Sequence, residues 1–193
     1  MRTTLIATLV CAGLAMIAAC VPFVPLTDFT PQMAGGTATT GHCIGLRRTE
    51  LTLDSVLVRV SLRVYPHVRK GRAEVQLRFI VPPGRTVELD SDQLLLSKLP
   101  GGAATQVRIP GFSTINNQAR EFAARTPMVG GAQTFGERSY VHEYWANVPL
   151  DAVPEGDVRV TFPQISINGR AHAIPTVTFQ QTPRLAWMVP LNC

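Results

Sequence analysis

The chain has 193 residues and a net charge of +5, from 18 Lys and Arg against 13 Asp and Glu; 16% of its residues are charged and 46% hydrophobic. This composition excludes a strongly charged disordered chain, and the length predicts one domain with its own core. The 15 Gly and 15 Pro favour a fold with many turns over a helical bundle.

Residues 1–19 predict a cleaved export signal. Arg2 is followed by an uncharged apolar run, which is too short to span a bilayer comfortably because about 20 apolar residues are needed. The tetrad Ile17-Ala18-Ala19-Cys20 closes this segment. It resembles the lipobox of bacterial lipoproteins. The resemblance implies that Cys20 is lipidated, with palmitate among its acyl chains, and becomes the first residue of the mature chain.

Two other interpretations of this segment stay open, an ordinary secreted protein cut at Ala-x-Ala and an uncleaved anchor. Val21 follows Cys20 where an inner-membrane retention signal usually has Asp, so the resemblance implies the outer membrane, with the domain facing the periplasm. Removal of the signal takes away one charge, Arg2, and leaves a mature chain of +4. The same segment accounts for the positive mean hydropathy of +0.14.

Residues 20–42 are predicted to form a flexible tether. Three prolines and three glycines in this stretch oppose regular structure. A flexible coil of this length spans roughly 25 Å, enough to hold a domain away from lipid headgroups. The folded domain is then expected to cover residues 43–193.

Two strands with one buried face are the clearest pattern in the chain. Apolar residues alternate with polar ones over 56–64 and again over 73–81. The stretch from Pro66 to Arg72 predicts a hairpin loop between them.

Shorter strand patterns follow, with one interruption. Residues 110–139 predict a long irregular insertion with a short helix over Gln118–Arg125, and Asn168-Gly169 predicts a tight hairpin. Seven to nine short strands predict an all-β fold, an antiparallel β-sandwich of immunoglobulin-like form. The further strands are expected at 87–89, 94–96, 107–109, 140–148, 158–162, 165–167 and 177–179.

The cysteines predict one disulfide. Cys11 leaves with the signal and Cys20 carries lipid, so Cys43 and Cys193 remain in an exported chain. Their bond would close a loop of about 150 residues and stabilise the fold by on the order of 4–5 kcal/mol. A redox or metal-binding pair is the alternative, but the spacing is not CxxC.

No motif predicts a catalytic, metal or cofactor site. His142-Glu143 lacks the second histidine of a zinc-protease helix, and Gly111-Phe112-Ser113 lacks the second glycine of a nucleophile elbow. The glycines at 130–136 have no Lys-Ser/Thr ending, and Asp90-Ser91-Asp92 lacks the later ligands of a calcium loop. An envelope hydrolase is therefore the least favoured function.

The basic excess lies in one predicted hairpin. Residues 56–81 hold six basic side chains against Glu74 alone, and Arg59, Arg63 and Arg78 are expected on one outer face. One interpretation is a solvated sheet face whose charges protect an edge strand. The other is a contact with an anionic envelope component, such as lipid headgroups or lipopolysaccharide phosphate. Nucleic acid is not expected in that compartment.

A second candidate surface is the aromatic-rich region 110–145. Exposed aromatics there would indicate a protein or glycan site. The sequence thus predicts a lipid-anchored, non-enzymatic binding or assembly module with an envelope protein partner. A module that binds glycan or an anionic envelope ligand is the alternative. The aromatic residues concerned are Phe112, Phe122, Phe135, Tyr140, Tyr144 and Trp145.

Overall fold

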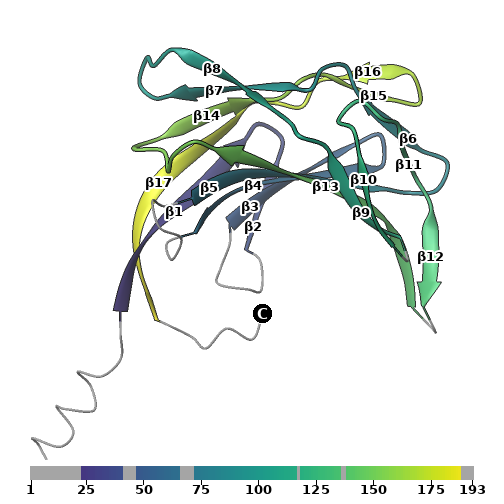
Figure 1. Ribbon diagram of the computed structural model, residues 1–193, viewed down its shortest axis with the longest axis horizontal. Coiled ribbons are helices and arrows are strands. Elements are labelled where there is room, and N and C mark those ends of the chain that lie inside the picture. The colour runs from purple at the N-terminus through teal and green to yellow at the C-terminus, as the bar shows by residue number, and fades with distance from the viewer. Residues whose placement is uncertain (1–22, 41–46, 66–71, 117, 136–137, 188–193) are drawn as a thin grey trace, which may run out of the picture. The chain divides into compact units, whose positions relative to one another are not determined.

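The computed structural model describes residues 23–40, 47–65, 72–116, 118–135 and 138–187 (Figure 1). The chain divides into two units. One comprises residues 28–182, and the other comprises residues 1–27 with 183–193, of which only strand segments 23–27 and 183–187 are described. The hydrophobic core lies within the unit of residues 28–182.

A large sheet forms one layer of this unit. Its strands pair antiparallel in the order β10-β9-β13-β5-β4-β3-β2, and β12 pairs with one end of β13. Their bounds are β2 Thr37–Thr40, β3 Arg47–Leu53, β4 Val56–Tyr65, β5 Arg72–Val81, β9 Phe112–Asn116, β10 Gln118–Phe122, β12 Ala132–Phe135 and β13 Arg138–Leu150.

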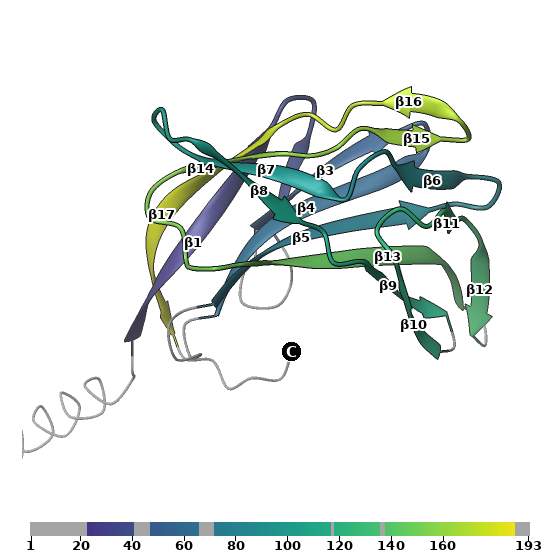
Figure 2. The same cartoon turned by 45° about the horizontal axis from the view of Figure 1, so that its top comes forward.

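Two smaller sheets form the opposite layer, over the inner face of the large sheet (Figures 1 and 2). The first has the order β1-β17-β14-β7-β8, with bounds β1 Phe23–Met33, β17 Val177–Trp187, β14 Val158–Thr161, β7 Gln93–Lys98 and β8 Ala104–Arg108. The second has the order β11-β6-β15-β16, with bounds β11 Met128–Val129, β6 Thr86–Leu89, β15 Ile165–Ile167 and β16 Arg170–His172. The described part of the chain is therefore all-β and contains no helix.

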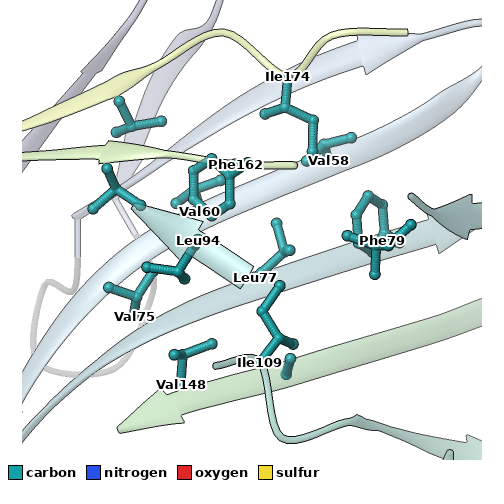
Figure 3. Close-up of a cluster of buried hydrophobic side chains, with 14 of the residues drawn as sticks. Val58, Val60, Val75, Leu77, Phe79, Leu94, Ile109, Val148, Phe162 and Ile174 are labelled. Atoms are coloured by element: carbon teal, nitrogen blue, oxygen red, sulfur yellow. The ribbon is translucent and has the colours of Figure 1, made fainter. Parts of the chain in front are cut away.

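One hydrophobic core joins the two layers. The alternation in β4 and β5 turns one face inward, where Val58, Val60 and Leu77 are fully buried. Leu94 of β7 and Phe162, just after β14, pack against them from the other layer (Figure 3). The two strands with the clearest sequence alternation thus form the centre of the molecule, and their prediction is confirmed.

The hairpin at Asn168-Gly169 is also confirmed. Both residues have positive φ, 49° and 79°, and β15 pairs antiparallel with β16 across them. The Asn168 side chain accepts a hydrogen bond from the Thr86 N–H at 2.8 Å and so ties the turn to β6.

The tether prediction is wrong for residues 23–33 and 37–40, which are strands β1 and β2. Prolines do not prevent β1 because it lies at the edge of its sheet, where a missing N–H breaks no ladder. Within the unit, β1 lies beside β17: Gln32 Nε2 donates to Gln180 Oε1 at 2.9 Å. The folded part therefore begins well before residue 43, the predicted boundary.

The irregular insertion and its helix are wrong as well. Strands β9 to β12 occupy most of residues 110–139, and Gln118–Phe122 is strand β10, paired with β9 along its whole length. A helix of this length is marginal without tertiary packing, and here the segment pairs with β9 and so joins the large sheet. With these strands and β1 to β3, the described residues hold seventeen strands rather than seven to nine.

Candidate functional site

The outer face of the large sheet carries the three predicted arginines. Arg59 stands directly opposite Arg78 in the β4–β5 register, and Arg63 stands opposite Glu74. The expectation that these arginines share one face is therefore confirmed by the strand register.

Carboxylates from neighbouring strands bind two of these arginines. Glu50 of β3 lies 2.8 Å from Arg59 and 3.0 Å from Arg48, and Glu143 of β13 lies 2.8 Å from Arg78. We call these five residues the charge ladder. Two of the six basic side chains of this hairpin, Arg59 and Arg78, are therefore paired across the sheet rather than left for an anionic partner.

A polar contact extends this network toward the end of the sheet. Tyr65 donates its hydroxyl to Glu74 Oε1 at 2.6 Å, and the Glu74 side chain is buried. Burial, followed by the hydrogen bond to Glu74, raises the pKa of the Tyr65 hydroxyl. Arg63 thus faces a carboxylate that already has a hydrogen-bond donor.

An open cleft of about 340 Å³ lies beside the charge ladder, between β13 and the start of β9. Trp145 and Asn147 of β13 form one side, and Ser113 stands opposite Trp145 in the register. No lining residue has an ionisable side chain. The full lining comprises Pro110, Gly111, Phe112, Ser113, Phe122, Ala123, Trp145 and Asn147.

Backbone and side-chain contacts fix the walls of the cleft. Gly111 passes so close to the backbone of β10 that a Cβ there would lie 2.4 Å from the Phe122 carbonyl oxygen, so only glycine fits. The Phe122 ring packs on Tyr144 with ring centroids 5.9 Å apart. Across β13, Asn147 Oδ1 accepts from Gln76 Nε2 at 2.9 Å.

A short two-stranded arm extends from the same strand. It consists of β12 and residues 138–141 of β13, and it extends to one side of the sheet in Figures 1 and 2. Tyr140 and Val141 are 49% and 41% exposed, and Val129, just before the arm, is 55% exposed. Neighbouring strand residues point to opposite faces, so Tyr140 and Val141 place apolar surface on both sides of the arm.

Two side chains of β13 contact the same backbone carbonyl at the base of the arm. The Val129 carbonyl accepts from the Tyr144 hydroxyl at 2.8 Å and lies 3.1 Å from His142 Nδ1. Burial raises the pKa of the Tyr144 hydroxyl. His142 and Glu143 therefore work on opposite faces of β13, one at the arm and one in the charge ladder, and they do not form an acid–base pair.

Several predicted positions lie outside the described residues. They include all four cysteines, so neither lipidation of Cys20 nor the bond between Cys43 and Cys193 has a structural test. The side chain of Phe135 also lies outside that part.

The aromatic-rich region divides between core and surface. Phe112 and Tyr144 are buried, Trp145 and Phe122 are partly buried at the cleft, and Tyr140 is exposed on the arm. The sequence pointed to these aromatics but not to Ser113 and Asn147. The alternation over 140–148 could have indicated Asn147, since it places this residue on the same face as Trp145.

Within the ranges that the structure describes, no three or more His, Cys, Asp and Glu side chains gather closely enough to hold a metal ion. No helix there is long and apolar enough to cross a membrane.

Comparisons with known proteins give no family for this chain. No family model matches it, and no curated protein or solved structure is significantly similar to it.

Proposed function

We propose that this chain is a lipid-anchored protein of the bacterial cell envelope, attached through Cys20 and facing the periplasm from the outer membrane. The signal segment and its final tetrad support this proposal. Cys20→Ala should abolish incorporation of labelled palmitate and release the protein from the membrane fraction. Cys11→Ala is the matched control and should change neither. Equal labelling of the two variants would contradict the anchor.

We also propose a disulfide between Cys43 and Cys193. The pairing of β1 with β17 supports it, because Gln32 and Gln180 show that segments near the two ends of the chain run side by side. Titration of free thiols in the denatured, oxidised mature protein should find none, and two should appear after reduction. Two thiols before reduction would refute the bond. The immunoglobulin-like form of the sandwich stays a prediction.

The function that the geometry supports best is the binding of an envelope protein partner at the β12 edge of the arm. The observation that supports this function is the exposed apolar surface of the arm. Among the described residues, four large apolar side chains are exposed, and three of them, Val129, Tyr140 and Val141, lie on or beside the arm. Exposed apolar side chains on both faces of one edge suit contact with a partner that covers that edge.

The open edge of β12 specifies how such a partner would bind. In the described residues β12 pairs only with β13, and its sequence Ala132-Gln133-Thr134-Phe135 has neither charge nor proline. Two other edge strands carry such protection, Pro31 in β1 and Arg108 in β8, whereas the edge strand β2 has only Thr and Ala, and none of the exposed large apolar side chains lies on it. An unprotected edge beside apolar side chains suits a partner that adds a strand to the sheet.

The backbone hydrogen bonds between β12 and β13 show which groups of β12 are available for an added strand. His142 N–H donates to the Gly131 carbonyl at 2.9 Å, so this opposing pair is hydrogen-bonded. Because hydrogen-bonded pairs alternate along an antiparallel ladder, the next such pair is Gln133 with Tyr140. The N–H and C=O groups of Ala132 and Thr134 therefore point away from β13, toward the open edge.

Site-specific photo-crosslinking tests this function. A photoreactive amino acid at position 140 or 141, in cells that produce the full chain, should give a discrete adduct with one envelope protein. The same amino acid at Leu95, which is 40% exposed on β7, is the control and should not give that adduct. Adducts of the same size at all three positions would indicate a non-specific contact and contradict the proposal.

A further inference from the structure

The cleft beside Trp145 is separate from the arm. We propose that this cleft binds a neutral sugar ring of a glycan chain. The proposal depends on the lining of the cleft and not on a protein partner at β12.

The lining selects against charge. None of its eight residues is ionisable, and the nearest cation in the register, Arg78, is held by Glu143 at 2.8 Å. A charged ligand would enter this cleft without a free counter-ion from the lining and would lose hydration. The chemistry of the cleft therefore fits an uncharged ligand.

The cleft combines a flat apolar surface with placed hydrogen-bonding groups. Trp145 contributes an indole, which is apolar over its face and has one N–H donor at its edge. The Ser113 hydroxyl can donate and accept. The Asn147 amide oxygen is fixed by Gln76, and its nitrogen has no partner among the described residues. The accessible surface of the lining is about equally polar and apolar, which suits a ligand that presents both hydroxyls and C–H groups.

A pyranose ring matches that combination. Its faces carry C–H groups that pack on an indole, and its edge carries hydroxyls that both donate and accept hydrogen bonds. The volume of about 340 Å³ lies at the small end of ligand sites, which span roughly 300–1,000 Å³, and suits one or two rings. Pro110, Ala123 and Asn147 at its rim are exposed, so a longer chain can continue into solvent.

Fluorescence titration tests the site, because the chain has two tryptophans and Trp187→Phe leaves Trp145 as the only tryptophan, which can be excited selectively over the tyrosines. The full chain, purified without sugar-based detergent, is titrated with maltotriose, cellotriose and N-acetylchitotriose, and with trigalacturonate as an acidic probe. At least one neutral trisaccharide should give a saturable change, with a Kd on the order of 1 mM for so open a site. Trigalacturonate should bind at least tenfold more weakly.

Two kinds of variant, followed by calorimetry, separate the site from the fold. Asn147→Ala should weaken binding of that trisaccharide severalfold, and Trp145→Ala should weaken it more than tenfold. Tyr140→Ala, which removes an aromatic ring from the arm, is the control and should leave Kd unchanged. If Trp145→Ala does not fold, the affinities of Asn147→Ala and Ser113→Ala for the trisaccharide show whether the cleft is the binding site. The proposal is overturned if no neutral sugar saturates, if trigalacturonate binds best, or if folded Asn147→Ala and Ser113→Ala bind as wild type.

Discussion

Arg59 and Arg78 stand directly opposite each other on β4 and β5, and each is bound by a carboxylate from the strand on its far side. Like charges opposed in this way destabilise a sheet unless they are neutralised. Glu50 and Glu143 supply the neutralising charges, so the row of arginines that the sequence shows as a basic surplus is part of the stability of the sheet.

Glu50→Gln should therefore destabilise the protein. The change leaves both Arg48 and Arg59 without their carboxylate while Arg59 still faces Arg78. For pairs that are partly shielded from solvent, we expect the free energy of unfolding to fall by about 1–2 kcal/mol, measured by urea denaturation. Asp92→Asn is the control, because its partner Arg108 is 76% exposed, and it should cost clearly less than Glu50→Gln. Equal losses of stability in the two variants would contradict a stabilising role of the charge ladder.

The buried tyrosine at the base of the arm, Tyr144, should make the fold less stable at alkaline pH. Burial raises the pKa of Tyr144 above its ordinary value of 10.0. The folded state therefore keeps this proton longer than the unfolded state does. The resulting contribution to stability is fully present below pH 10 and is lost as pH rises through the folded-state pKa.

Tyr144→Phe tests this contribution. At neutral pH the variant should lose about 1 kcal/mol, because the hydrogen bond to the Val129 carbonyl disappears. Above pH 10 the gap between variant and wild type should narrow. Urea denaturation at pH 8 and pH 11 measures the free energy of unfolding of both proteins. A difference between them that widens at pH 11 would contradict a raised pKa of Tyr144 in the folded state.

Gly111→Ala should distort the cleft and the β9–β10 hairpin. The new Cβ would lie 2.4 Å from the Phe122 carbonyl oxygen, so the backbone must move, and we expect a loss of about 2 kcal/mol or more in thermal unfolding. Gly84→Ala is the control. Its φ is also positive, at 78°, but nothing lies within 4 Å of the added methyl, so only backbone strain of about 1 kcal/mol is expected. A smaller loss at position 111 than at position 84 would contradict the close approach.

The sequence predicted the strands whose two faces differ. In β4 and β5 apolar residues occupy every inner position and mostly polar residues the outer ones, and Asn168-Gly169 allows few conformations other than a tight turn. β1 was missed because Pro25 and Pro31 are compatible with an edge strand, and local sequence does not show which strand forms an edge. The strands within 110–139 were missed because their stability comes from pairing with partners rather than from local pattern.

The residues of the candidate sites were also predictable only in part. Trp145 stands out in the sequence as an aromatic residue, but the cleft exists because the chain at Gly111 passes close to Phe122 before β9 begins. Arg59 and Arg78 stand out as charges, but Glu50 and Glu143, which neutralise them, come from strands that only the sheet order brings beside them. Register, which depends on the whole fold, decides the role of each residue.

The most direct test of the proposed partner site is a single proline at the open edge of β12. Thr134→Pro removes an N–H that points away from β13 and leaves the pairing of Gln133 with Tyr140 intact, so the arm should keep its fold. The adduct formed from position 140 should fall at least tenfold, whereas Thr134→Ala, which keeps the N–H, should form it as wild type does. An undiminished adduct with Thr134→Pro, in a protein that melts at the wild-type temperature, would contradict strand addition at β12.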